Sequence, residues 1–340
     1  MSKPTLLLNP GVGWAATTPF HYTLTLDNNY AHMGHKKENW YLKRLFNYPR
    51  FEKTYEKIYN FKGLTSNRPS DHPWGNTLSY NNRYSVQTDL EIYKKQPPSI
   101  HNYIQYYKNL WEVVKNDYAA VCDFSNCNFG LPFRFWQEIA PILQENFNVK
   151  VTFQFRDPIR RYFSEVGSLC NSSLINEDEF YKMNFISKRY RNKKQHKKLF
   201  FYLLQQDSAS ELCYYSEAWS KFTSVFGEKN CYGIIMEDFW DKTREKQQLE
   251  ALSNFLSHKI TKVHENCYVP DMGSNPPHYE FLKDQWTSDL EDLTVEDYNV
   301  ALLYMNTYYM SFKETFGLSL IHISEPTRRT PISYAVFCLK

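Results

Sequence analysis

Short apolar runs alternate with longer segments along residues 1–317, and this alternation limits the fold more than any other feature of the chain. The runs are rich in Leu, Val, Ile and Phe, which is typical of strands buried on both faces of a parallel sheet. The longer segments repeat their apolar residues at helical spacing. The pattern predicts an α/β fold in which a central parallel sheet is flanked by helices.

Individual elements can be placed on this pattern. The predicted strands are Thr5–Leu8, Tyr30–Met33, Tyr118–Cys122, Lys150–Phe155 and Cys231–Met236. The predicted helices are Pro19–Leu26, Tyr103–Lys115, Arg134–Asn146, Pro158–Leu169, Lys197–Phe226, Thr243–Leu256 and Glu296–Phe316. Residues 60–98 are rich in Asn, Ser, Tyr and Pro and predict a long surface excursion. Since no linker or repeat divides these elements, residues 1–317 are expected to form a single domain.

Residues 318–340 break the pattern. They follow Gly317, a natural helix stop, and have neither helical nor strand periodicity. Residues 318–328 resemble the in-frame translation of a transposon-library sequencing adapter, and residues 332–339 resemble the flow-cell tail of that adapter. An irregular natural tail is the alternative, but two matches in the correct order favour an adapter-derived artefact and a metagenomic source. These residues are therefore left out of the fold and the function.

The composition excludes several classes of protein. The 340 residues are 42% hydrophobic and 17% aromatic, which excludes disorder, and a net charge of +3 argues against a general polyanion-binding surface. Because the chain has no long uncharged apolar run and no signal segment, we expect no membrane partner and a cytoplasmic location. Its seven cysteines form no CxxC pair, so neither a metal site nor a disulfide framework is predicted.

The first candidate site is the small-residue segment after the first predicted strand. A tight turn that leads from a strand into a helix N-terminus presents N–H groups to an anion, and Thr18 is the predicted N-cap. An ordinary structural turn is the alternative. A Walker A loop is excluded, because Ala16 stands where that motif needs lysine. The residues predicted to bind the anion are Gly11, Val12, Gly13, Trp14, Ala15, Ala16, Thr17 and Thr18.

The second candidate site follows the fourth predicted strand. Arg156-Asp157-Pro158 leads into a predicted helix, and Ser164 lies two turns later on the same side of that helix. Arginine offers a two-pronged donor to phosphate, and a serine hydroxyl adds a neutral hydrogen bond. Arg156 and Ser164 are therefore predicted to hold a phosphate monoester at the carboxyl edge of the sheet. In the alternative interpretation, Arg156 pairs with Asp157 and Ser164 is merely exposed.

Taken together, the two segments resemble the sulfotransferases that use 3′-phosphoadenosine-5′-phosphosulfate as donor. In that family the first loop ends in Gly-Thr-Thr, where this chain has Ala16-Thr17-Thr18. The family's 3′-phosphate motif, Arg-(Asn/Asp)-Pro-x-x-Arg-x-x-Ser, is matched at every spacing from Arg156 to Ser164. Further segments resemble later family motifs in the same order, namely residues 122–125, 236–239 and 254–256. The resemblance implies a P-loop-NTPase-like sulfotransferase fold, this co-substrate and no metal.

Residues 34–41 resemble the Lys-Glu-x-x-aromatic segment of sulfotransferases that act on heparan sulfate and related glycans. The resemblance implies that Glu38 is the general base for a hydroxyl acceptor and that Lys37 is a cation near donor or acceptor. It favours a carbohydrate acceptor and places the chain in that branch or among phage or bacterial relatives. An ordinary charged helix start is the alternative, and His35 and His101 are weaker candidates for the base.

Two further features keep other functions open. Trp14 stands where the family loop carries Lys or Arg, and losing that cation would slow transfer by orders of magnitude unless Lys36 or Lys37 replaces it. A catalytically inactive relative that binds a nucleotide or a glycan is therefore the alternative function. Residues 188–198 hold seven basic side chains, which predict a solvated face or a rim that steers anions. RNA binding through them has no supporting motif, so no nucleic-acid partner is expected. The oligomeric state stays open.

Overall fold

The computed structural model describes residues 3–13, 15, 17–25, 28–32, 41–47, 97–171, 196–205, 213–239, 241, 243–263 and 293–316. Within them, parallel strands form one sheet in the order β2-β3-β1-β4-β5. The strands are β1 (Thr5–Leu8), β2 (Tyr30–His32), β3 (Ala120–Asp123), β4 (Asn148–Phe155) and β5 (Cys231–Ile235). The predicted central parallel sheet is confirmed.

The position of β1 at the centre of the sheet determines where a ligand can bind. Leu7 of β1 lies opposite Cys122 of β3 and Lys150 of β4. The chain passes from β1 to β2 and β3 on one side, and then crosses to β4 and β5 on the other. In open α/β sheets, ligands bind beyond the carboxyl ends of the strands where the order reverses in this way. The loops after β1 and β4, which hold both predicted anion sites, border this switch point.

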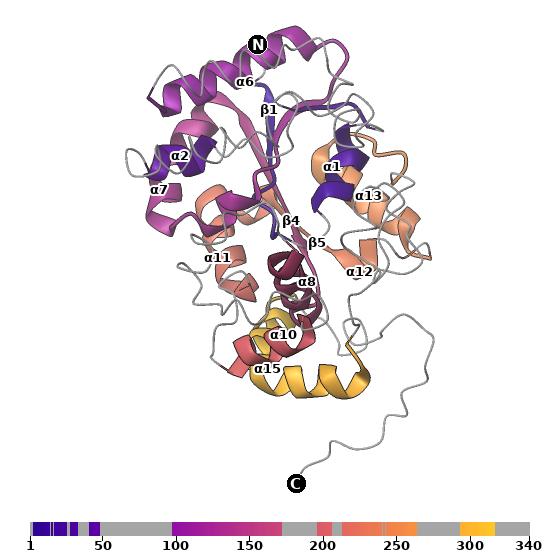
Figure 1. Cartoon of the computed structure of the whole chain (residues 1–340). Helices are drawn as coiled ribbons and strands as arrows, with labels where there is room; N and C mark the ends of the chain where they lie inside the picture. The colour runs from indigo at the N-terminus through magenta and orange to yellow at the C-terminus, as the bar shows by residue number, and fades with distance from the viewer. Residues whose placement is uncertain are drawn as a thin grey trace.

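Helices cover both faces of the sheet, as Figure 1 shows, and confirm the predicted architecture. Successive strand side chains point to opposite faces, so Leu6 and Leu7 of β1 belong to different apolar clusters. The cluster with Leu6 packs against α6 (Ile100–Val114), α7 (Phe133–Asn146) and α11 (Tyr215–Phe226). The cluster with Leu7 packs against α1 (Thr17–Thr25) and α13 (Glu245–Leu256). Shorter helices are α2 (Tyr41–Asn47), η1 (Asn126–Gly130), η5 (Glu228–Asn230) and α12 (Met236–Phe239).

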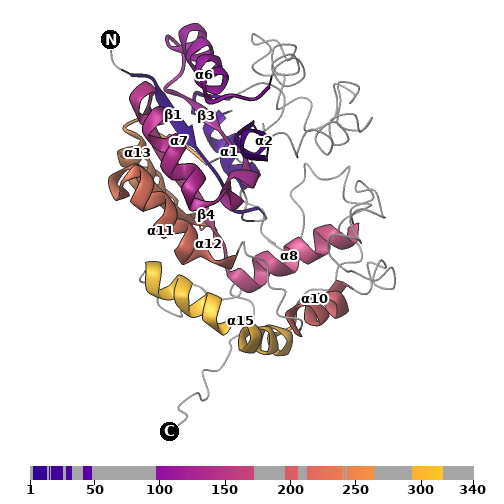
Figure 2. The ribbon, with the colours of Figure 1, turned by 90° about the vertical axis from the view of Figure 1, so that its left-hand side faces the viewer.

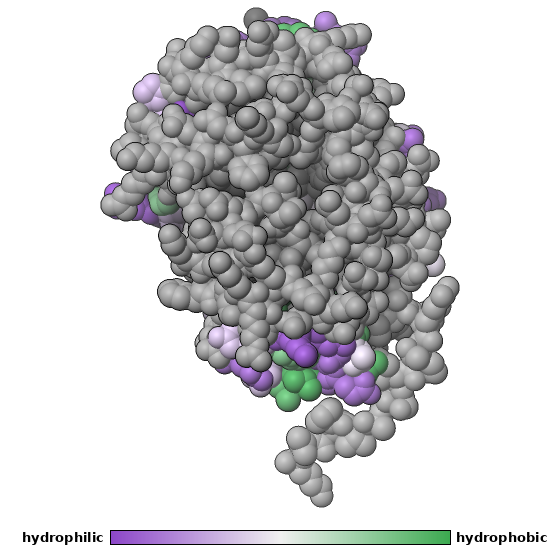
Figure 3. Space-filling view, in the orientation of Figure 1, coloured by the Kyte–Doolittle hydropathy of each residue, from purple (hydrophilic) through white to green (hydrophobic). Residues whose placement is uncertain are grey.

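A separate group of helices lies beyond the carboxyl end of β4, at the bottom of Figure 2. It consists of α8 (Pro158–Asn171), α10 (His196–Gln205) and α15 (Val295–Phe316). A third apolar cluster, which includes Ile159, Phe200 and Met305, holds the group together. On its outer side α15 leaves Leu303 exposed at 80%, and Figure 3 shows hydrophobic and hydrophilic residues mixed at this end. The group supports the segment that follows β4.

The predicted single helix Lys197–Phe226 is wrong. α10 ends at Gln205, Cys213 and Tyr214 are not α-helical, and α11 starts at Tyr215. The two helices belong to different layers, because α10 packs with α8 and α15 whereas α11 packs against the sheet. A straight helix could not reach both layers. Apolar periodicity continues on each side of the break and therefore did not reveal it.

Two sequence predictions fall largely outside the described residues. These are the surface excursion, of which only Pro97 and Pro98 are described, and the tail 318–340. The described helices include none with both the length and the apolar character needed to cross a bilayer.

Candidate anion-binding site

The loop that leaves β1 is anchored to both neighbouring strands. The backbone N–H of Asn9 donates to the carbonyl of Asp123 in β3 at 2.7 Å, and its side-chain amide donates to Thr152 Oγ1 in β4 at 2.9 Å. Gly11 has a φ of +73°, a conformation that favours glycine. A Cβ atom there would lie 2.3 Å from Asn126 Oδ1, so no larger residue fits without a shift. The start of the loop, residues 9–11, is therefore held in one defined path.

The structure places most of the predicted loop residues. Val12 and Ala15 are fully buried in the apolar core, and the N–H of Ala15 donates to the carbonyl of Val12 at 3.3 Å. Any contact of these two residues with an anion would therefore involve the backbone. α1 begins at Thr17, so Thr18, the predicted N-cap, lies inside the helix. Trp14 and Ala16, and the side chain of Thr18, are outside the described part of the chain.

Arg156 and Ser164 come together as their spacing predicts. Arg156 Nη1 donates to Ser164 Oγ at 2.9 Å, and the hydroxyl donates to the carbonyl of Arg160 at 2.9 Å. Both side chains are half-buried. The Asp157 carboxylate instead accepts from the N–H of Arg160 at 2.8 Å and from the Tyr298 hydroxyl. The strand end and the first two turns of α8 therefore place a guanidinium beside a hydroxyl, and both groups can donate to a phosphate once the Ser164 O–H turns away from the Arg160 carbonyl.

Arg161 connects this pair to the loop after β1. Its side chain is 0% exposed, and Nη1 donates to the carbonyl of Gly13 at 3.3 Å. Nη2 forms an ion pair with Glu165, one turn further along α8, at 2.5 Å. One buried guanidinium thus bridges the two candidate anion sites. Arg161 is the second arginine of the matched Arg-Asp-Pro-x-x-Arg-x-x-Ser segment, and the segment by itself assigned it no role. An arginine followed by a glutamate four residues later was the signal that could have suggested one.

Glu237 also lies at this edge of the sheet. Its Oε1 atom accepts from the N–H of Asp157 at 3.1 Å, so α12 contacts the start of α8. Burial, followed by the negative charge of Asp157, raises the pKa of Glu237 to about 7, although Arg156 acts in the opposite direction. Burial likewise raises the pKa of Asp157. A carboxyl group next to the Arg156–Ser164 pair is therefore poised to change its charge near neutral pH.

Comparisons with known proteins place three sulfotransferases among the solved structures that resemble this chain. The enzyme of Alicyclobacillus acidocaldarius is 14% identical, with a TM-score of 0.47 over 94% of this chain and 98% of that chain. A sulfotransferase of Mycobacterium avium is 14% identical, with a TM-score of 0.39 over 94% and 78% of the two chains. The sulfotransferase domain of a Synechococcus olefin synthase is 12% identical, with a TM-score of 0.37 over 94% and 97%. No family model and no curated protein matches. Likeness this distant carries no functional conclusion.

The predicted catalytic residues remain predictions. Glu38 and Lys37 lie outside the described residues, as do His35 and Lys36. His101 is exposed in the first turn of α6. Among the described residues, no three His, Cys, Asp or Glu side chains are grouped to hold a metal ion.

Of the basic run 188–198, only residues 196–198 are described. There, Lys197 Nζ pairs with Asp297 Oδ2 at 2.7 Å, which ties α10 to α15. This lysine therefore contributes to packing of the helical group. The steering role of the other basic residues stays a prediction.

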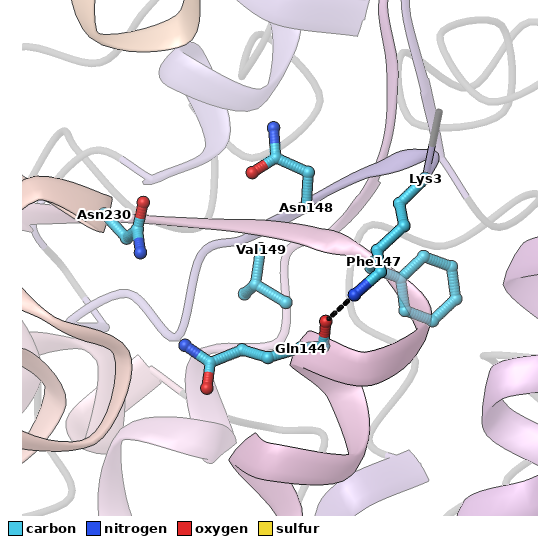
Figure 4. A pocket seen from close by; sticks show the side chains of 6 residues that line it. All are labelled: Lys3, Gln144, Phe147, Asn148, Val149 and Asn230. Carbon is cyan, nitrogen blue, oxygen red and sulfur yellow. Dashed lines mark hydrogen bonds between the residues drawn. The ribbon is translucent and has the colours of Figure 1, made fainter. Parts of the chain in front are cut away.

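A small pocket lies at the opposite edge of the sheet, near the amino ends of β1 and β4 (Figure 4). Lys3 Nζ donates to the carbonyl of Gln144 at 2.8 Å, and the Asn230 amide donates to the carbonyl of Phe226 at 2.9 Å. These donors already stabilise the protein's own backbone. The pocket lies apart from the candidate anion-binding site.

Proposed function

We propose that this protein is a sulfotransferase that moves a sulfuryl group from 3′-phosphoadenosine-5′-phosphosulfate to the hydroxyl of a carbohydrate acceptor. The observation that carries the proposal is the Arg156–Ser164 pair, joined at 2.9 Å and bridged through Arg161 to the loop after β1. The donor has an anionic group at each end of its ribose. Two anion sites on adjacent strands at a topological switch point suit such a ligand.

Two features of the described residues support this donor. Gly11, where a Cβ atom would clash with Asn126, lets the loop turn tightly after β1. The nine-residue helix α1 directs its N-terminus to the end of this loop, and a helix N-terminus favours negative charge. In this proposal the loop and α1 hold the 5′-phosphosulfate, while Arg156 and Ser164 hold the 3′-phosphate.

The proposed reaction is an in-line displacement. The acceptor oxygen forms a bond to sulfur while the bond from sulfur to the 5′-phosphate oxygen breaks, so negative charge develops on that oxygen. Loop N–H groups and the α1 dipole would stabilise this charge. The acceptor hydroxyl loses its proton to a base, for which we propose Glu38, with Lys37 as a nearby cation. The reaction needs no metal.

A catalytically inactive binding protein is the second candidate function. It is favoured by Trp14, which occupies the loop position where a cation would assist departure of the leaving group. In this case the donor or its product would bind without turnover.

Isothermal titration calorimetry with 3′,5′-adenosine bisphosphate, ATP and 5′-AMP tests the donor site. We expect the bisphosphate to bind most tightly. Ser164→Ala should weaken bisphosphate binding about tenfold, because one hydrogen bond to a charged group is lost. Ser253→Ala is a matched control, because Ser253 Oγ also donates to the carbonyl four residues earlier and accepts one bond, from Ile260 N. Preference for ATP, or equal binding of all three nucleotides, would contradict the proposal.

Transfer of radiolabelled sulfate to a panel of glycans separates the two candidate functions. Transfer that Glu38→Gln abolishes, while the bisphosphate still binds, supports an enzyme with Glu38 as base. Bisphosphate binding without transfer to any acceptor supports the inactive binding protein.

A further inference from the structure

Asn126, the first residue of η1, contacts both ends of the loop after β1. Its Nδ2 atom donates to Thr17 Oγ1 at 3.1 Å, where the loop enters α1. Its Oδ1 atom lies beside Gly11, only 2.3 Å from where a Cβ atom would be, and Thr17 Cγ2 would be 3.3 Å from that same Cβ position. Gly11, Thr17 and Asn126 therefore meet at one point, although Asn126 is 109 residues from Thr17 in the sequence.

The environment of this side chain is energetically unusual. Asn126 Oδ1 is buried and has no hydrogen-bond partner in the part of the chain that the structure describes. A buried acceptor without a partner costs about 1–3 kcal/mol, so such groups are rare in folded proteins. An apolar side chain of similar size would avoid this cost but could not donate to Thr17. The arrangement favours the loop contact over maximal stability.

The bond also has a consequence for the Thr17 hydroxyl. A hydroxyl has one O–H to donate, and it can accept through its lone pairs. Because Thr17 Oγ1 accepts from Asn126, the orientation of its own O–H is restricted. Thr17 is the first residue of α1, next to the helix N-terminus that would face an anion.

We propose that Asn126 is a positioning residue for the anion-binding loop, which acts through Gly11 and Thr17 and sets the affinity of the loop for a 5′-phosphate or 5′-phosphosulfate group. The inference rests on the proposed donor site and adds to it a residue from the segment after β3. It assigns Asn126 to the 5′ end of the ligand, whereas Arg156 and Ser164 belong to the 3′ end.

The affinities of the protein for two nucleotides test whether Asn126 acts only on the 5′ end of the ligand. Asn126→Ala should weaken the binding of 3′,5′-adenosine bisphosphate about tenfold, since it removes the half-buried hydrogen bond to Thr17. Its affinity for adenosine 3′-monophosphate, which has no 5′ group, should stay unchanged. The matched control is Asn230→Ala. It removes a similar hydrogen bond, which the Asn230 side-chain amide donates to the Phe226 carbonyl at 2.9 Å, at the opposite end of the strands. It should leave both affinities unchanged, even where thermal unfolding shows equal loss of stability in the two variants.

A double-mutant cycle tests whether Asn126 acts through Thr17. Thr17→Val keeps the shape and removes the hydroxyl. The combined variant should lose less bisphosphate affinity than the product of the two single losses. The proposal would be overturned if Asn126→Ala weakened the binding of both nucleotides equally or of neither, or if the affinity losses in the cycle were strictly multiplicative. The proposed donor site would stand in each of these cases. Failure of the unchanged protein to bind either nucleotide would overturn both proposals.

Discussion

At the scale of single residues, the acids beside Arg156 give the site a dependence on pH. Glu237 accepts from the backbone of Asp157, and burial together with that neighbouring acid raises the pKa of Glu237 to about 7. Below this pH the protonated carboxyl carries no charge that would repel a phosphate held by Arg156. Above it, the carboxylate competes with the phosphate for the guanidinium.

We therefore predict that Glu237 makes bisphosphate binding weaker as the pH rises through about 7. The same group contributes stability that is present below its unfolded pKa and is lost as the pH rises through its raised folded pKa. Calorimetric titrations across this pH range would measure the first effect. Phosphate also titrates near pH 6, so the informative quantity is the difference between the unchanged protein and Glu237→Gln. Parallel pH profiles for the two proteins would contradict the prediction.

At the scale of elements, α8 is joined to the β1 loop by a buried arginine. Arg161 is 0% exposed and its partner Glu165 is 14% exposed, so the pair is largely removed from water. Removing one member of a buried pair leaves the other uncompensated, which typically costs about 3–5 kcal/mol. The bond from Arg161 to the Gly13 carbonyl adds a positional role.

Arg161→Ala should therefore lower the free energy of unfolding by about 3 kcal/mol and also weaken bisphosphate binding. Arg134→Ala is the control, because Arg134 pairs with Glu138 at the same four-residue spacing but with 89% and 63% of the side chains exposed. Arg134→Ala should lower the free energy of unfolding by less than about 1 kcal/mol. Urea denaturation of both variants measures the contrast, and similar losses would show that the buried pair has no special weight.

At the scale of the whole molecule, α15, the last helix that the structure describes, supports the site from a distance of 141 residues in sequence. The Tyr298 hydroxyl donates to the buried Asp157 carboxylate, and Asp297 pairs with Lys197 of α10. The start of α8 is thus held by the sheet on one side and by the helical group on the other.

Tyr298→Phe removes one donor from a buried carboxylate and should lower stability by about 1–3 kcal/mol. The same carboxylate accepts from the N–H of Arg160 at the start of α8. Without Tyr298 to hold the carboxylate, the start of α8 should become less ordered, and bisphosphate affinity should fall. Tyr304→Phe, in the same helix but 45% exposed, is the matched control. Thermal unfolding and calorimetry should separate the two variants. Identical behaviour of the two variants would show that α15 does not support the site.

The adapter-like segment 318–340 gives a second prediction for the whole chain. α15 ends at Phe316, so a protein that stops at Gly317 keeps every described element. We expect it to have the same melting temperature and bisphosphate affinity as the full chain. A lower melting temperature after truncation would show that the segment packs on the domain.

The sequence by itself determined the features that depend on local pattern. Apolar runs located the strands, and the pairing of Arg156 with Ser164 followed from a strand end and two turns of one helix. Only the tertiary structure decided the contacts of Arg161 with Gly13, Asn126 with Thr17 and Tyr298 with Asp157. Each joins residues more than 100 positions apart, so it depends on strand order and helix packing. Local periodicity carries no information on strand order or on helix packing. For the same reason it did not reveal the break between α10 and α11.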